Sequence, residues 1–189
     1  MKTFAYCCAS FAVSAAKAAG VTPITCPPVT ADTFQPLWLV GRQFIYFDLH
    51  GEAGQPYWAG DNGLFALTAE TIRQADLGGA TVFAANCHLT DTDHPMLDAL
   101  LAANAGAVIG GTGVNYSGKG TTFGASLLGM WVRRMLSLGC SPDEALRLAK
   151  RRIQAALLSA TVLDDKEREM VNQDTLAFSL YTDNRVGLV

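Results

Sequence analysis

The sequence predicts an α/β fold built on one mostly parallel β-sheet. Short apolar runs of strand length recur along the chain, and stretches with helical periodicity lie between them. The apolar runs also lack a regular alternation with polar residues, which is typical of strands that are covered on both faces. Alternating strands and helices of this kind predict a parallel sheet with helices packed on it.

The expected elements follow one another from the N-terminus to the C-terminus. Strands are expected at residues 4–9, 44–49, 81–85, 107–110 and 176–181. Helices are expected at residues 11–19, 69–76, 95–103, 123–138 and 142–158. Residues 21–30 contain three of the seven prolines and are expected to form a loop.

The helix at 142–158 has the clearest boundary signals. Ser141 is a suitable N-cap, Pro142 fits the first turn, and Glu144 completes a Ser-x-x-Glu capping box. Gly139 is suited to end the preceding helix in a left-handed conformation. The two helices are therefore expected to be joined by a tight turn.

Composition points to a single domain that spans residues 1–189. Half of the residues are hydrophobic and 16% are charged, so the chain can fill a large core and is not intrinsically disordered. The net charge is −3, and the one basic run covers residues 150–152. A nucleic-acid partner bound through phosphate neutralisation is therefore not expected.

The five cysteines indicate reduced thiols. Their number is odd, two are adjacent and no Cys-x-x-Cys pair occurs, so neither a disulfide framework nor a thiolate zinc site is indicated. This pattern favours the cytoplasm, although residues 1–19 leave open a weak signal peptide and secretion. No apolar run is long enough to span a bilayer, and no membrane partner is expected. We expect Cys7, Cys8, Cys26 and Cys140 to be packing residues.

Two predicted strands end in reactive side chains. One stops at His50 and Gly51, and another stops at Cys87. Because ligands bind at the carboxyl ends of parallel strands, His50 and Cys87 are expected at one edge of the sheet. A nearby imidazole makes a thiol nucleophilic, and the amides of Gly51 and Cys87 are suited to stabilise an oxyanion. The alternative is that Cys87 is a small buried hydrophobe and His50 a structural histidine.

Further segments extend this pattern over residues 40–189. A Leu67-Thr68 helix start precedes the strand that ends in Cys87, and a Gly-Ala-Val-Ile-Gly strand follows at residues 106–110. Residues 139–150 read Gly-Cys-Ser-Pro-Asp-Glu-Ala-Leu-Arg-Leu-Ala-Lys. In order and spacing, these segments resemble the caspase-like cysteine peptidases, most closely the CHAT and gingipain-like branches.

The resemblance implies a caspase-like three-layer α/β/α sandwich and a cysteine endopeptidase. By this resemblance, Cys87 would be the nucleophile that forms a thioester acyl-enzyme, and His50 the general acid/base that protonates the leaving amine. Gly51 would contribute to the oxyanion hole. The implied partner is a peptide or protein substrate, with no cofactor and no metal, and the oligomeric state stays open.

The chain departs from the family pattern near the nucleophile. Ala85 stands where relatives often have Ser, Asp or Gln in the specificity pocket. Asp91 follows the nucleophile closely and could form a pocket for a basic side chain, or belong to a solvated turn. Near the C-terminus, residues 182–184 read Thr-Asp-Asn where relatives have Gly-Asp-Pro. Substrate preference is therefore left open.

Three alternatives remain at this stage. The first is a zinc site, with the ligand types of a Cys-His-x-x-Asp-x-x-His cluster at Cys87, His88, Asp91 and His94; His88 also competes with His50 as the partner of the thiol. The second is nucleotide binding, since residues 113–121 nearly match a phosphate-binding loop but have Gly120 at the hydroxyl position. The third is a caspase-like interaction module without catalysis.

Overall fold

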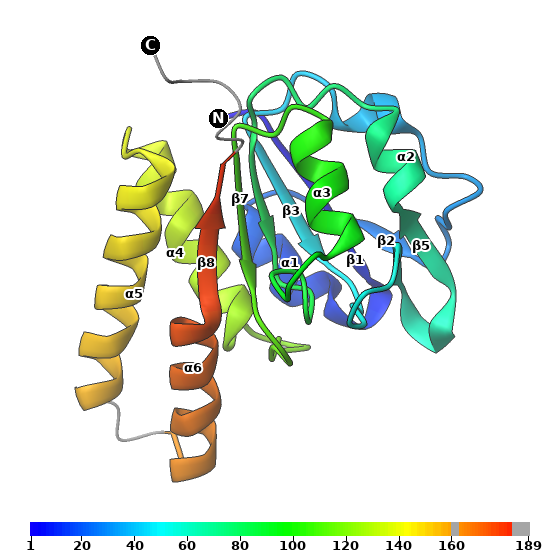
Figure 1. The fold of residues 1–189 in the computed structure, drawn as a ribbon. Helices are drawn as coiled ribbons and strands as arrows, with labels where there is room; N and C mark the ends of the chain where they lie inside the picture. The colour runs from blue at the N-terminus through cyan, green and yellow to red at the C-terminus, as the bar shows by residue number, and fades with distance from the viewer. Residues whose placement is uncertain (160–162, 183–189) are drawn as a thin grey trace.

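A computed structural model describes residues 1–159 and 163–182. Its centre is a six-stranded sheet in the order β2-β1-β3-β6-β7-β8 (Figure 1). The strands are β1 (Thr3–Cys8), β2 (Ile24–Cys26), β3 (Phe44–Asp48), β6 (Thr81–Ala84), β7 (Ala107–Gly111) and β8 (Phe178–Tyr181). The first five are parallel, and β8 runs antiparallel to β7 at one edge.

Helices cover both faces of this sheet, which makes a three-layer α/β/α sandwich (Figure 1). The helices are α1 (Ala12–Ala19), α2 (Ala69–Arg73), α3 (Pro95–Ala102), α4 (Ala125–Ser137), α5 (Pro142–Ser159) and α6 (Asp165–Ala177). Three 3-10 turns lie at Ala9–Phe11, Pro36–Leu39 and Asp61–Gly63. A two-stranded hairpin, β4 (Tyr57–Ala59) and β5 (Phe65–Thr68), stands beside the sheet.

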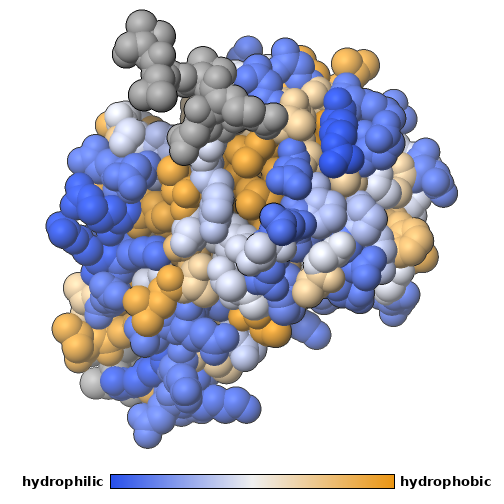
Figure 2. All heavy atoms as spheres, in the orientation of Figure 1, coloured by the Kyte–Doolittle hydropathy of each residue, from blue (hydrophilic) through white to orange (hydrophobic). Residues whose placement is uncertain are grey.

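The sheet divides the core into two layers. Side chains on one face pack with α2, α3 and the hairpin, and those on the other face pack with α1, α4 and α5. On the face shown in Figure 2, hydrophilic residues make up much of the outer surface of α5 and α6, with hydrophobic patches among them, and further hydrophobic residues lie between α5 and the sheet. The burial of both sheet faces explains why the strands read as continuous apolar runs.

Most of the expected elements are confirmed within a few residues. Five of the six sheet strands lie in segments predicted as strands, and the helices α1 to α5 lie in segments predicted as helices. Glu144 N donates to Ser141 Oγ at 3.3 Å, so Ser141 does serve the start of α5. Gly139 has a φ of 91°, as a left-handed helix end requires.

Several elements differ from the expectation. The expected loop at 21–30 contains β2, and the hairpin and α6 lie in segments for which the sequence suggested no element. The C-terminal strand begins at Phe178, after α6, rather than at residue 176. Of the family segment at 182–184, Thr182 alone belongs to the described residues. Within residues 1–159 and 163–182, no helix is long and apolar enough to cross a membrane.

Candidate active site at the carboxyl edge of the sheet

A cavity of about 270 Å³ opens at the carboxyl ends of β3 and β6. Its walls come from four parts of the chain: the turn after β1, the two strand ends, and the loop between β7 and α4. The lining residues are Phe11, Asp48, Leu49, His50, Ala85, Cys87, Asn115, Tyr116, Ser117 and Lys119. The predicted pair, His50 and Cys87, therefore lines one cavity.

The parallel pairing of β3 with β6 brings His50 and Cys87 to this edge. Phe47 is the register partner of Ala84, and both strands then leave the sheet toward the cavity. Beyond the register, Asn86 Oδ1 accepts a hydrogen bond from Leu49 N at 3.1 Å and ties the two strand ends together. His50 is fixed by paired backbone hydrogen bonds with Ala59 of β4, at 2.8 and 2.9 Å.

The Cys87 thiol bonds to the backbone of the β7–α4 loop. Asn115 N donates to Cys87 Sγ at 3.3 Å, and the thiol donates to Asn115 O at 3.6 Å. Burial raises the pKa of Cys87, while the Asn115 amide lowers it. In the described parts of the chain, neither hydrogen bond of this thiol goes to His50. Cys87 is thus held as a thiol in a cavity that His50 also lines.

Two buried carboxyl groups near Cys87 make its thiolate less stable when they are ionised. Asp48 ends β3 and accepts a hydrogen bond from Tyr46 Oη at 3.1 Å, and burial raises its pKa to about 7. Burial likewise raises the pKa of Asp174, on α6, to about 7. Each carboxylate, when ionised, raises the pKa of Cys87. The thiol is therefore easiest to ionise when both carboxyl groups carry protons.

The His50 ring sits between an aromatic ring and two further polar groups. Its centroid lies 5.7 Å from that of Phe11, in an edge-to-face arrangement. One ring nitrogen, the Cys8 sulfur and a carboxylate oxygen of Asp61 all lie within 4.8 Å of one another. The Asp61 carboxylate is itself held by the amide and hydroxyl of Ser10, at 2.8 and 2.6 Å.

Of the two amides expected to bind an oxyanion, that of Cys87 belongs to a residue that lines the cavity, whereas Gly51 is not among the lining residues. Within residues 1–159 and 163–182, the Gly51 amide donates no hydrogen bond, and the Cys87 amide interacts with the thiol of its own residue. The two backbone segments are also in close contact, because a Cβ atom at position 51 would collide with the carbonyl oxygen of Cys87. Glycine is therefore needed at position 51 for this approach.

The other predicted site residues are placed in different ways. Ala85 lines the cavity, whereas Asp91 does not. Asp91 Oδ1 accepts from Gly113 N at 2.9 Å, and its Oδ2 lies 2.8 Å from His88 Nδ1. Asp91 thus braces the turn after Cys87, and the His88 ring is engaged there rather than with the thiol.

The four residues of the zinc alternative do not converge on one point. His94 Nδ1 accepts from Met96 N at 3.2 Å, and its Nε2 donates to Glu52 O at 3.1 Å, so both ring nitrogens are occupied. Among the described residues, the one group of three side chains close enough to hold a metal is Cys8, His50 and Asp61. Sequence reasoning assigned Cys8 to packing and did not single out Asp61.

The loop of the nucleotide alternative is folded back on itself. Ser117 pairs with Gly124 in an isolated bridge, and α4 begins at Ala125, six residues after Lys119. In a phosphate-binding loop the lysine lies at the start of the helix. Lys119 instead lines the cavity with Cys87, so this geometry gives no support to nucleotide binding.

Comparison with known proteins adds no family assignment. No family model matches this chain, and no curated protein matches it.

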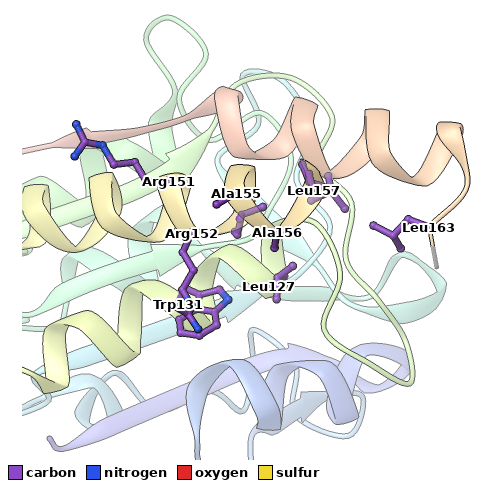
Figure 3. Close-up of a pocket in the computed structure, with 10 residues that line it drawn as sticks. Leu127, Trp131, Arg151, Arg152, Ala155, Ala156, Leu157 and Leu163 are labelled. Carbon is purple, nitrogen blue, oxygen red and sulfur yellow. The ribbon is translucent and has the colours of Figure 1, made fainter. Parts of the chain in front are cut away.

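A larger, apolar cavity of about 670 Å³ lies among α4, α5 and α6 (Figure 3). Trp131 forms part of its wall, and the Arg152 guanidinium lies 4.1 Å from the centroid of its ring (Figure 3). None of its lining residues borders the cavity of Cys87, and no lining side chain is a nucleophile or a general base. We therefore place the candidate chemistry in the smaller cavity.

Proposed function

We propose that the protein is a cysteine endopeptidase that hydrolyses peptide bonds through Cys87 and His50. The observation that carries this proposal is that both side chains line one cavity, at the ends of neighbouring parallel strands. A thiol and an imidazole on a shared cavity are the parts that nucleophilic acyl transfer needs. The motif resemblance to caspase-like peptidases supports the same reaction.

The first half of the reaction forms an acyl-enzyme. His50 accepts the Cys87 proton, and the thiolate attacks the carbonyl carbon of the scissile peptide bond. The amides of Gly51 and Cys87 donate to the oxyanion. When the C–N bond breaks, protonated His50 gives its proton to the leaving amine, and the acyl group stays on Cys87 as a thioester.

The second half returns the free enzyme. His50 accepts a proton from water, and the hydroxide attacks the thioester carbonyl. The C–S bond then breaks, the product leaves as a carboxylic acid, and the proton on His50 returns to the Cys87 thiolate. No cofactor or metal takes part in this sequence.

The surroundings of Cys87 indicate when the thiol is activated. Burial favours the neutral thiol, and its sulfur is bonded to Asn115. A substrate that enters the cavity displaces water and brings an acceptor carbon to the sulfur, so proton transfer to His50 accompanies attack. Catalysis by a general base fits this site better than a preformed ion pair.

A fluorogenic peptide library tests the proposal. We expect cleavage by the wild-type chain, and a fall to the uncatalysed rate in Cys87→Ala and His50→Ala. Cys140→Ala is the matched control, because Cys140 is another partly exposed thiol but lies between α4 and α5. Absence of cleavage by the folded wild-type chain across the library would instead favour a non-catalytic interaction module.

A further inference from the structure

The cluster of Cys8, His50 and Asp61 combines three kinds of metal ligand at one place. The Cys8 sulfur, a ring nitrogen of His50 and a carboxylate oxygen of Asp61 lie within 4.8 Å of one another. In a tetrahedral zinc site, bond lengths of about 2.0–2.3 Å place the ligand atoms about 3.3–3.8 Å apart. A contraction of at most about 1–1.5 Å would therefore bring the three ligand atoms to the spacing of a zinc coordination shell.

The backbone holds these ligands from three different segments. Cys8 ends β1, His50 follows β3, and Asp61 begins the turn after β4. The parallel pairing of β1 with β3 aligns the first two, and the backbone bridge between His50 and Ala59 brings the third alongside. The site is thus assembled by the same sheet edge that positions Cys87.

Each ligand also has a partner that orients it. Ser10 donates two hydrogen bonds to the Asp61 carboxylate, at 2.8 and 2.6 Å. The Cys8 thiol donates to Ala59 O at 3.7 Å, and the His50 ring rests against Phe11. Such outer contacts fix ligand orientation in metal sites.

Burial leaves one side of the cluster open. Cys8 is buried, Asp61 is half-buried and His50 is exposed. A cation can therefore enter past His50, and three protein ligands leave a fourth position for water.

We propose that Cys8, His50 and Asp61 bind a zinc-type divalent cation, and that the bound cation switches off the reaction of Cys87. A thiolate, an imidazole and a carboxylate together suit zinc better than magnesium or calcium, which prefer oxygen ligands. Metal binding stands on the cluster alone, whereas the inhibition rests on the proposed peptidase function.

The inhibition is expected because a neutral imidazole has only one nitrogen with a free lone pair. When one ring nitrogen donates its lone pair to a metal, the other keeps its proton. His50 then has no free lone pair with which to accept the Cys87 proton. This holds for whichever nitrogen of His50 faces the metal.

Titration of the metal-free full-length chain with Zn²⁺ and with Co²⁺ tests the binding site. We expect one ion per chain, and a near-ultraviolet charge-transfer band for the cobalt–thiolate bond. Cys8→Ser should abolish this band, and Cys8→Ser and Asp61→Asn should each weaken Zn²⁺ binding by about 100-fold or more, since even outer-shell losses cost 10–100-fold.

Two controls separate this site from other thiols. Cys7→Ser should leave Zn²⁺ affinity and the cobalt band unchanged, because Cys7 packs in the layer on the opposite face of the sheet. Cys87→Ala should also keep Zn²⁺ affinity while losing peptide cleavage. Unchanged affinity in both Cys8→Ser and Asp61→Asn, or its loss in Cys87→Ala, would overturn the proposed site. Thermal melting shows that each variant is folded.

Inhibition is measured separately from binding. Saturating Zn²⁺ should abolish peptide cleavage by the wild-type chain, and a chelator should restore it. Full cleavage with zinc bound would refute the switch but leave the metal site standing. Absence of cleavage by the metal-free chain would count against the peptidase function and not against the metal site.

Discussion

Gly51 combines a close backbone contact with a proposed role in the reaction. Its backbone lies against the carbonyl group of Cys87, and in the proposed mechanism its amide donates to the oxyanion. A side chain at this position has to push two strand ends apart. In the proposed mechanism, the separation of these strand ends sets the distance between Cys87 and the amide of Gly51.

Gly51→Ala should therefore lower the rate of peptide cleavage by about 100-fold, which is the typical cost of losing an oxyanion donor. Gly120→Ala is the matched control, because no atom lies within 4 Å of a Cβ built at that glycine. Cleavage rates and melting temperatures of both variants check the prediction. Wild-type activity in Gly51→Ala would show that this contact does not shape the site.

Asp174 links the stability of the molecule to pH. Its Oδ2 atom accepts hydrogen bonds from Tyr116 N at 3.0 Å and Ala125 N at 2.8 Å, at the start of α4. Burial outweighs these bonds and raises its pKa from 3.8 to about 7. The folded chain keeps this proton up to about pH 7, whereas the unfolded chain loses it near pH 4. The contribution of Asp174 to stability is thus greatest below pH 4 and falls as the pH rises to about 7.

Asp174→Asn should therefore flatten the loss of unfolding free energy between pH 4 and pH 7. Urea unfolding at a series of pH values measures this slope. Asp98→Asn, an exposed aspartate on α3, serves as the control and should keep the wild-type slope. A slope in Asp174→Asn equal to that of the wild type would contradict the assignment.

Sequence reasoning predicted some of these residues and not others. His50 and Cys87 could be found because each follows an apolar strand, and parallel strands end at a common edge. Asn115, Asp61 and Asp174 could not be found in this way. They reach the sheet edge from the loop between β7 and α4, the turn inside the β4–β5 hairpin and the last turn of α6, and their own sequence neighbourhoods carry no signal for such a site.

At the scale of helices and strands, an element could be predicted from the sequence when most of its residues are buried. The strands β1, β3, β6 and β7 are buried along their length and read as apolar runs. In contrast, α6 buries few residues and is largely polar, so it lacks the apolar stripe that indicates a helix. The available signal was its capping box, in which Asp164 and Glu167 exchange hydrogen bonds.

The sequence analysis did not predict the short strands β2, β4 and β5, and the reason differs between β2 and the hairpin. β2 has three residues and directly precedes two prolines, so composition alone indicates a loop there. The β4–β5 hairpin contains Asn62-Gly63, both with positive φ, and this dipeptide between apolar segments is a hairpin signal. The hairpin matters for the site because it carries Ala59 in β4 and Asp61 in the turn between its two strands.

The contact of α4 with the sheet offers a test of packing. A Cβ atom at Gly129 would lie 2.7 Å from the Tyr46 ring and 2.9 Å from the Phe83 ring, both of which are buried. Alanine stabilises a helix over glycine by up to about 1 kcal/mol, but overpacking a core costs about 1–3 kcal/mol. Gly129→Ala should therefore destabilise the chain by about 1 kcal/mol in urea unfolding. Equal or greater stability than the wild type would show that α4 is not packed against the sheet this tightly.

At the scale of the whole molecule, the residues of both proposed sites lie at the carboxyl edge of the sheet. The carboxyl ends of β1, β3 and β6 bring Cys8, His50 and Cys87 to neighbouring positions. His50 follows the strand that lies between β1 and β6, and we propose that it takes part either in the reaction of Cys87 or in metal binding with Cys8. The two proposed roles exclude each other because a metal-bound imidazole has no free lone pair for the Cys87 proton.

The most direct test of the peptidase proposal is site-specific labelling of the metal-free chain by a peptidyl acyloxymethyl ketone, followed by mass spectrometry of the modified peptides. We predict that Cys87 is modified in the wild-type chain and that His50→Ala prevents this, whereas Cys140→Ala does not. An unmodified Cys87 in the folded wild-type chain, or equal modification in His50→Ala, would contradict the proposal that Cys87 and His50 act together.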